Sequence, residues 1–318
     1  MSNRYDECDR EALRTYGRFD DAQSLFIARE LTHIRAQILQ VKKATLNAFN
    51  VFPVQTDVPE GADTAVQKVY DSVGVAAIIS NFADDLPRVD LLAKEEVARV
   101  RYVGGAYGYS YKELKNAQMI GVNLNTDKGA AVKRAVDTKL NRIAWNGVDG
   151  DPHSGFLSNE NINEFVLPAD GTESSTKLRD KTEEQILRDL NDFVNSVRVA
   201  TNYEETVNTL LLPPEVHAFL STKRLSDTSR TLMEYFRAAH PEITRVMSVG
   251  ELAGAGDDGK DVMVAGYFDA GYIKFEIPVR FRQLPIQYRN MEFVINCFAT
   301  TLGVTINIPF AFVKSEGC

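Results

Sequence analysis

An amphipathic segment near the middle of the chain, Asn125 to Gly147, constrains the fold most strongly. Its apolar side chains recur every three or four residues, which is the spacing of one helix face, and charged side chains take the other face. The apolar set is Ala131, Val132, Ala135, Val136, Leu140, Ile143 and Ala144. Asn125 or Thr126 can cap the first amides, and Gly147 can end the helix in the left-handed conformation. We expect a long helix without catalytic residues, and we interpret it as a structural spine.

The composition is that of a globular protein with enough apolar residues for a core. The chain has 318 residues, of which 44% are hydrophobic and 25% charged, so one large domain or two to three small ones are possible. Its formal net charge of -8 argues against tight binding of nucleic acid, because such binding depends on clustered Lys and Arg that release counterions. Any contact with DNA is therefore expected to be weak.

Signals for membranes, export and disulfides are absent from the sequence. No apolar run approaches the roughly 20 residues that a membrane span requires, and the first residues lack the apolar core of a signal peptide. We therefore expect no membrane association and synthesis in a cytoplasm. Cys8, Cys297 and Cys318 form no CxxC pair, so neither a disulfide framework nor a zinc site is indicated. Cys297 is expected to be reduced and buried.

The part of the chain before the spine favours arm-like structure. Leu25 to Leu46 carries the stripe of a second amphipathic helix, and Pro53 ends any continuation of it. Two β-leaning stretches follow, one around Val66 to Ser72 and one at 95–110, EEVARVRYVGGAYGYS. We expect these two limbs to pair as a long two-stranded arm. Such a helix and such an arm are marginal alone, so they need a neighbouring surface, which can belong to another subunit.

The part after the spine is typical of a compact mixed domain with strands at its end. A short helix at 111–119 precedes the spine, and a loop rich in Gly, Asn, Asp and Ser at 147–163 follows it. Thr182 and Gln185 form the capping box of a helix whose stripe is Ile186, Leu187, Leu190, Phe193, Val194 and Val197. The further expected elements are a strand at 206–212, helices at 215–220 and 231–239, a loop at 254–261, a strand at 262–268, and half-buried strands at 273–281 and 304–312.

No residues have the spacing of a metal site or an activated nucleophile. The histidines are scattered without an HExxH motif, so core or surface positions are the better interpretation. They are His33, His153, His217 and His240. Ser110 lies outside a GxSxG motif, and the SxxK spacing of Ser174 to Lys177 lacks its companion motifs.

Three other features have both a functional and a structural interpretation. Gly104–Gly108 resembles half of a phosphate cradle, but a flexible bend where the arm re-enters its domain fits better. Asp84–Asp85 and Asp257–Asp258 lack the ligand ladder of a calcium loop, so we expect solvated turns. Trp145 is interpreted as a packing anchor. We therefore predict no catalytic, cofactor-binding or metal-binding residues, no cofactor and no enzyme activity.

Several stretches of the sequence, in this order, are similar to those of one protein family. They are AQSLFIARELTHIRAQI running to FPV, GYSYKELKNAQMIG followed by TDKGAAVKRAVD, LLLPPEVHAFLSTKRLSDTSRTLMEYF, and YIKFEIPVRFRQLPIQ. Together with the order of arm, spine and compact domain, they resemble the major capsid proteins of tailed bacteriophages and prophages, which have the Hong Kong 97-type fold. The resemblance covers most of the chain from about Asp21 onward.

The resemblance implies an α+β fold in five parts and a role in a virion. The parts are an N-terminal arm with an amphipathic helix at 1–52, an extended β-loop at 53–104, a peripheral domain with the spine helix at 105–160, an axial α/β domain at 161–266, and returning C-terminal strands at 267–318. It also implies self-assembly, as hexamers and pentamers, into an icosahedral shell that encloses double-stranded DNA. Arm and loop would lie over neighbouring subunits.

Further partners and alternatives follow from the same comparison. Portal, scaffolding and decoration proteins are implied partners, and we expect a separate scaffolding protein because no long charged segment precedes the arm. Lys68 and Lys94 match no motif of the Lys–Asn cross-link that some family members form, so we predict no cross-link. An encapsulin-like bacterial compartment is an alternative within the same fold. A cytoplasmic enzyme with the loop at 147–155 as a site wall is an alternative from another class.

Overall fold

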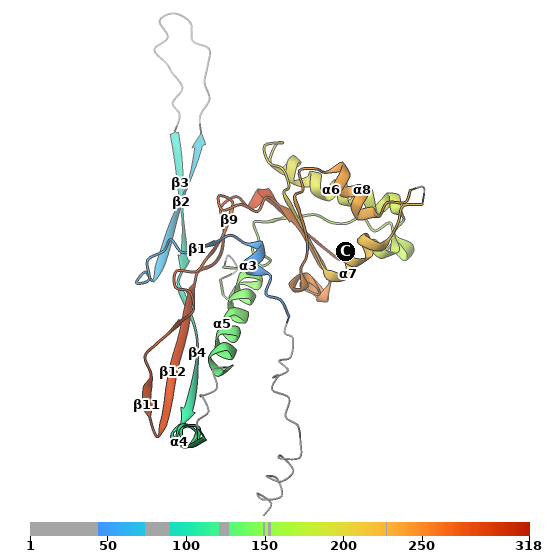
Figure 1. Ribbon diagram of the computed structural model, residues 1–318. Helices are drawn as coiled ribbons and strands as arrows, with labels where there is room; N and C mark the ends of the chain where they lie inside the picture. The colour runs from blue at the N-terminus through green and yellow to red at the C-terminus, as the bar shows by residue number, and fades with distance from the viewer. Residues whose placement is uncertain (1–43, 74–89, 121–126, 149, 152–153, 227) are drawn as a thin grey trace, which may run out of the picture. The chain divides into compact units, whose positions relative to one another are not determined.

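The structure is a computed structural model that describes residues 44–73, 90–120, 127–148, 150–151, 154–226 and 228–318 (Figure 1). Thr45–Cys318 forms one compact unit, and the description below concerns this unit. Most of the helix expected at 25–46 and the loop of the expected arm lie outside the described residues, as do Asn125, Thr126 and Asp84–Asp85. Among the helices that the structure describes, none combines the length and the apolar content needed to cross a membrane.

A five-stranded sheet in the order β5-β14-β8-β6-β7 is buried on both faces. Its strands are β5 (Asn163–Glu164), β14 (Phe312–Glu316), β8 (Val262–Gly266), β6 (Thr209–Leu212) and β7 (Arg245–Ser248). Leu210 and Leu212 point into one hydrophobic cluster, and Leu211 points into another on the opposite face. Burial on both faces explains why β6 and β8 are continuous apolar runs instead of alternating ones.

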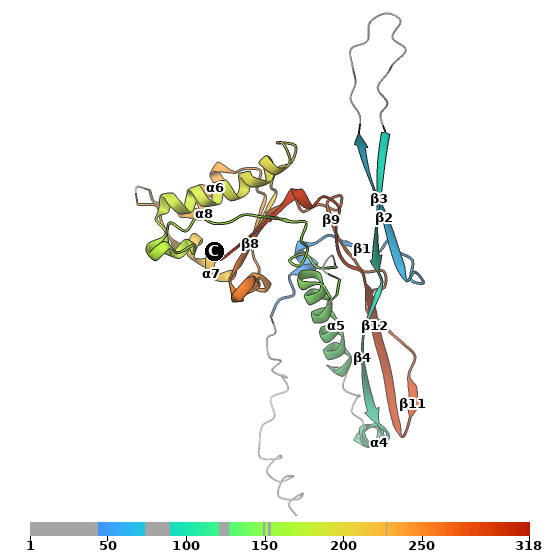
Figure 2. The same ribbon diagram turned by 180° about the vertical axis from the view of Figure 1, so that it is seen from behind.

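Three helices cover one face of this sheet. They are α6 (Glu183–Ala200), α7 (Pro214–Thr222) and α8 (Leu232–Ala239), and Figure 2 shows α6 and α8 from behind. The predicted capping box of α6 is confirmed, because the Thr182 side chain accepts a hydrogen bond from the amide of Gln185. Its predicted apolar stripe is also confirmed, and Leu187 is its one partly buried member. A second capping box, Thr231 and Glu234, opens α8 and was not predicted.

The predicted spine is the helix α5 (Asp127–Asn146), and it packs against β4, β12, β13 and the short helix α3 (Ala48–Val51). The apolar side chains of its second half are buried as expected, whereas Ala131 and Ala135 are exposed. The predicted apolar stripe therefore began too early in the helix. Trp145 is a packing anchor, as predicted, because its ring is buried 4.9 Å from that of Phe52. Gly147 has a φ of 71°, which confirms the left-handed end of the helix.

A second sheet is centred on two long strands, β4 (Arg101–Ser110) and β12 (Glu292–Thr301), with β10 (Arg282–Gln283) and β11 (Gln287–Arg289) on the other side of β12. The strand β12 was not predicted from the sequence. The bend predicted at Gly104–Gly108 is wrong, because these residues lie inside β4. A Cβ atom at Gly105 would lie 3.1 Å from Val132 Cγ1 of α5. The glycine therefore allows the helix to approach the strand closely.

The expected two-stranded arm exists, but its second limb was placed incorrectly. β2 (Thr64–Val73) pairs with β3 (Asp90–Arg99) in an antiparallel ribbon. The amide of Val100 donates to Asp63 O at 2.9 Å, and the chain then continues as β4 in the other sheet. The stretch at 95–110 is therefore divided between two sheets, because the partner of β4 is the distant strand β12, which local periodicity cannot reveal.

A third sheet joins β1 (Val54–Gln55), β9 (Ile273–Glu276) and β13 (Gly303–Ile306). The strand predicted at 273–281 ends at Glu276, although Ile277 and Val279 remain buried. The single strand predicted at 304–312 is wrong, because a 3-10 helix at Pro309–Ala311 separates β13 from β14. Pro309 begins this turn, and proline lacks the amide that a strand would use. The short helix before the spine is confirmed as α4 (Tyr111–Ile120).

Candidate intersubunit surfaces

The ribbon of β2 and β3 has two edges without a strand partner in the described part of the chain. Val66 and Val97 lie directly opposite each other in the register, and both side chains are exposed. A two-stranded ribbon of this length is marginally stable in water unless other surfaces pack against it. Exposed apolar pairs and free strand edges are features of surfaces that bind another chain.

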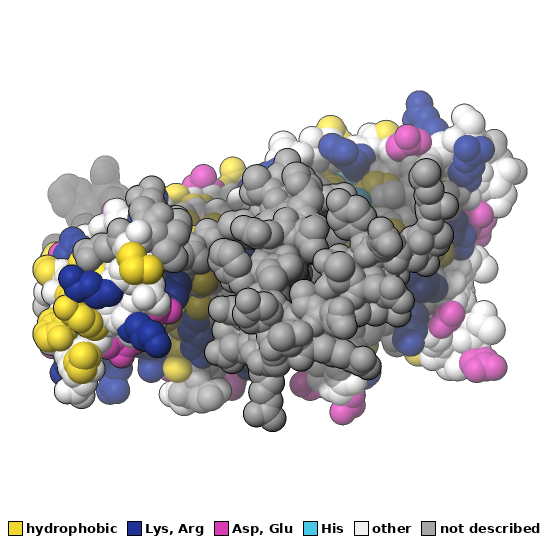
Figure 3. Space-filling model, turned by 60° about the horizontal axis from the view of Figure 1, so that its bottom comes forward, with side chains coloured by type: hydrophobic (Ala, Val, Ile, Leu, Met, Phe, Trp, Pro, Cys, Tyr) yellow, Lys and Arg dark blue, Asp and Glu magenta, His cyan; other side chains and the backbone are white. Residues whose placement is uncertain are grey.

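A second exposed apolar surface lies beside the turn between β11 and β12. Every residue from Arg282 to Glu292 is exposed, and we name the large apolar members of this segment, Leu284, Ile286, Tyr288 and Met291, the hairpin surface. Figures 1 and 2 place this turn beside α4, and Figure 3 shows hydrophobic side chains interleaved with Lys and Arg at this end of the molecule. The amide of Tyr111, the first residue of α4, donates to Met291 O at 2.8 Å.

A third surface follows α6 near its end. A shallow groove of about 470 Å³ is lined by side chains that include Val199, Ala200 and Val313 together with the carboxylates of Glu164 and Asp192. Val166, Val199 and Tyr203 are exposed near this helix. The groove contains no nucleophile paired with a base, so its chemistry suits contact with another protein surface better than catalysis.

A cavity of about 730 Å³ lies where α3 meets α5. Phe49, Phe52 and Phe281 contribute to its apolar wall, and Lys133, Asp137, Arg245 and Arg280 contribute its charged groups. Burial raises the pKa of Asp137, while Lys133 and Arg134 act in the opposite direction. These groups can bind a polar or anionic surface, but they include no arrangement of nucleophile, base and orienting group.

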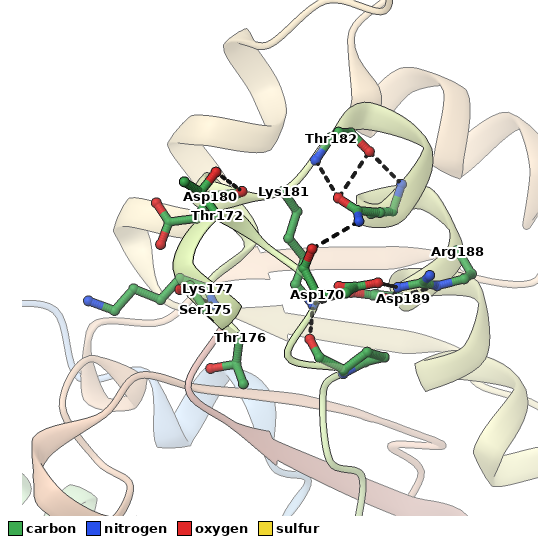
Figure 4. A network of polar contacts seen from close by, with 12 residues as sticks. Asp170, Thr172, Ser175, Thr176, Lys177, Asp180, Lys181, Thr182, Arg188 and Asp189 are labelled. Carbon is green, nitrogen blue, oxygen red and sulfur yellow. Dashed lines mark hydrogen bonds and ion pairs between the residues drawn. The ribbon is translucent and has the colours of Figure 1, made fainter.

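Two polar networks in the interior were not found by sequence reasoning. Figure 4 shows the first, in which the side chains of Lys181 and Asp189 are fully buried and Asp170 and Arg188 join them. This network connects the segment before α6 to the helix itself. Lys181 directly precedes the predicted cap Thr182, and that position gave no sign of burial.

The second network connects α3, α5 and the turn at Gly250–Leu252. Asn141 Oδ1 accepts from the amide of Ala48 at 2.9 Å, and Asn141 Nδ2 donates to Glu251 Oε1 at 2.8 Å. Glu251 also accepts from the amide and the side chain of Asn47. The sequence feature that could have indicated this network is a polar residue beside the apolar stripe of the spine, since Asn141 directly follows Leu140.

Among the described residues, those considered for chemistry in the sequence lie in separate parts of the fold. Ser110 accepts from the amide of Glu113 and so caps α4, and Asp257 and Asp258 are exposed in a turn. His240 contacts Glu242 and Asn191, and His33 and His153 lie outside the described residues. Within the described part of the chain, no three His, Cys, Asp or Glu side chains gather as a metal site would require. Cys297 is a free, buried thiol, as predicted.

The loop considered as the wall of an enzyme site packs onto the end of the spine. Ser154 Oγ accepts from the amide of Val148 at 2.9 Å, and the amide of Phe156 donates to Ala144 O at 2.9 Å. The described residues of this loop, 147–148, 150–151 and 154–155, line neither the cavity at α3 nor the groove along α6.

Comparison with protein families decides between these interpretations. The sequence model described as "Major capsid protein" matches residues 74–318. The chain belongs to the major capsid protein family. It is a structural subunit of a capsid shell and a component of a virion, and copies of it assemble into capsid oligomers. No curated protein matches the chain in a sequence comparison.

Solved capsid structures share the fold of this major capsid protein at low sequence identity. The capsid of Myoviridae phage XM1 is similar with a TM-score of 0.75 and 15% identity, over 92% of this chain and 98% of that chain. The capsid of a native GTA particle gives a TM-score of 0.63 at 10% identity, over 90% and 94% of the two chains. Gordonia phage Cozz gives 0.57 at 15% identity, over 90% and 91%. The predicted Hong Kong 97-type fold is confirmed.

Proposed function

We propose that this capsid subunit forms the closed icosahedral shell around the double-stranded DNA of a tailed bacteriophage. The family membership carries the proposal, and the exposed apolar pairs on the ribbon and the hairpin surface support it. A shell of many copies is held by weak contacts repeated by symmetry, so each surface need only bury a modest area. Hexamers and pentamers are the expected oligomers.

The proposed organisation assigns a role to each part of the chain. Residues 1–52 would form the arm, 53–104 the extended loop, 105–160 the peripheral domain, 161–266 the axial domain, and 267–318 the returning strands. Portal, scaffolding and decoration proteins would be the other partners. The subunit would be made in the host cytoplasm and would have no catalytic, cofactor-binding or metal-binding residues.

Contact with the enclosed DNA would be weak and non-specific. The formal net charge of -8 supports this, because it disfavours association with a polyanion. Weak contact also suits a container whose DNA must be packed and later released.

Sedimentation of the purified chain, expressed alone and with a candidate scaffolding protein, tests the proposal. Negative-stain microscopy of the fast-sedimenting fraction should show closed shells or rings of five and six copies. A circular dichroism spectrum with mixed helix and strand content verifies that slow species are folded. A folded monomer that forms no particle in either expression would refute the proposed function. Particles loaded with an enzyme would instead support a compartment.

A further inference from the structure

We propose that Met291 is an anchor residue that docks into a second copy of this chain, and that the strained turn that carries it is kept for this contact. The inference rests on the proposed function and deepens it, because it names one side chain on the hairpin surface as the group that makes the contact. Backbone strain, exposure and charge each support it.

The turn at Met291 is conformationally unfavourable for that residue. Arg289 pairs with Glu292, so Asn290 and Met291 form a two-residue loop between β11 and β12. Their φ values are 45° and 62°, which is the left-handed pair of a type I′ turn. Asn suits the first position, but Gly is preferred at the second because a Cβ atom is disfavoured there. Glycine at position 291 would therefore make the turn of this hairpin more stable.

The fold itself makes little use of the Met291 side chain. It is 64% exposed, so burial within the subunit does not offset the strain. The contact that fixes the turn to α4 is made by the carbonyl oxygen of Met291, which accepts from the amide of Tyr111. Any residue can supply that carbonyl. An observed strained residue without an internal role is a reason to infer a role outside the subunit.

The neighbours of Met291 indicate what it contacts. Ile286 is 64% and Tyr288 60% exposed, so the methionine lies among other exposed apolar side chains, as at surfaces that bind a protein partner. Charges of both signs surround it, with Arg289 and Glu292 flanking the turn and exposed Lys112 and Glu113 on the first turn of α4. Interleaved carboxylates disfavour a polyanion, whereas a mixed-charge surface matches the mixed-charge surface of another copy. The flexible methionine can fill an irregular apolar gap there.

Three substitutions test the role of the Met291 side chain. Met291→Gly removes both the side chain and the strain, and we expect a melting temperature raised by about 2 °C together with at least a tenfold loss of assembled particles. Asn290→Gly is the matched control for a glycine in this turn, since it keeps Met291 and its left-handed backbone, and it should assemble normally. Met291→Leu keeps an apolar side chain under the same strain and should also assemble. The measurement is the particle fraction by sedimentation at equal subunit concentration.

A photo-cross-linking residue, p-benzoylphenylalanine, at position 291 gives a readout that does not depend on stability. Illumination of assembled wild-type-like particles should yield cross-links between copies. Assembly of Met291→Gly at the wild-type level, or cross-links confined to one chain, would overturn the inference while leaving the capsid function intact. A wild-type chain that remains monomeric under every condition would refute the proposed function, and the inference with it.

Discussion

Lys181 Nζ lies 2.5 Å from Asp189 Oδ2, and neither side chain is exposed to solvent. Lys181 also donates to Pro168 O at 2.6 Å, and Arg188 binds the other carboxylate oxygen of Asp189. The pair therefore connects the segment before α6 to the first turns of that helix. A buried ion pair whose remaining donors and acceptors are also satisfied tolerates the loss of one partner poorly.

Replacing Asp189 with alanine should destabilise the unassembled subunit by about 3–5 kcal/mol, because Lys181 is left charged and buried. Urea unfolding measures the change. The control is Glu215→Ala, which breaks the exposed ion pair of Glu215 and Arg179 and should cost about 0–1 kcal/mol. The double variant Lys181→Met/Asp189→Leu should recover most of the loss. Equal effects of Asp189→Ala and Glu215→Ala would contradict the burial of the pair.

Asn141→Ala should lower the free energy of unfolding by about 1–3 kcal/mol, since it leaves the amide of Ala48 without a partner and removes one of the donors to the carboxylate of Glu251. Thermal unfolding of the unassembled subunit measures this. Asn141→Asp is the sharper variant, because a second carboxylate would face Glu251 and the loss should be greater at neutral than at acidic pH. An Asn141→Asp variant as stable as wild type at pH 7 would be inconsistent with this network.

Glu276→Gln should stabilise the subunit at neutral pH. Burial raises the pKa of Glu276 above its ordinary value of 4.5, and the nearby Asp57 acts in the same direction. Wild-type stability is then fully present below pH 4.5 and declines as the pH rises through the higher folded-state pKa. The uncharged glutamine avoids this decline, so its advantage should vanish in acid. Unfolding curves between about pH 3 and about pH 8 measure the difference, because both limits lie about 1.5 pH units or more from the ordinary pKa of 4.5.

Glu113→Gln supplies the control of opposite sign for that experiment. A hydrogen bond from the amide of Ser110, together with Lys128, lowers the pKa of Glu113. Its contribution to stability is therefore present above pH 4.5 and is lost as the pH falls through the lower folded-state pKa. Glu113→Gln should weaken the subunit at neutral pH. The same sign of change in both variants would refute the assignment.

Gly266→Ala should prevent correct packing of β8 against β14. A Cβ atom at this position would overlap Phe312 Cδ1 and would lie 2.9 Å from Ala311 O. Overpacking of a buried site typically costs about 1–3 kcal/mol, and we expect the upper end here. Gly61→Ala is the matched control, because its added Cβ would have no described residue within 4 Å apart from its chain neighbours, and its effect should stay within about 0.5 kcal/mol. Soluble yield and thermal unfolding report both.

Local chemistry in the sequence predicted the helices well. The stripe of α6, its Thr182 cap and the left-handed end at Gly147 depend on neighbours within one or two helical turns, so they can be read from spacing. The buried part of the spine from Val136 to Trp145 followed from the same periodicity. The family resemblance supplied the fold, and no local pattern revealed the hairpin surface as a candidate contact site.

The sheets were predicted less well because their partners are distant in the chain. The sequence of 95–110 predicted extended structure. Its first part pairs with β2 and its second part with β12, and these partners depend on the tertiary structure. The same is true of Asn141 and Lys181, whose burial depends on what packs over them. Met291 illustrates the limit most clearly, since its left-handed backbone is imposed by the register of Arg289 with Glu292.

The sequence by itself determined where helices begin and end, which faces are apolar, and which family the chain resembles. Those properties follow from short-range spacing and from conformational preferences of single residues. The tertiary structure alone decided which strands pair, which polar groups are buried together, and which apolar side chains stay exposed on the subunit. Pairing and burial depend on surfaces brought together from distant parts of the chain, and local periodicity does not predict which of these surfaces meet.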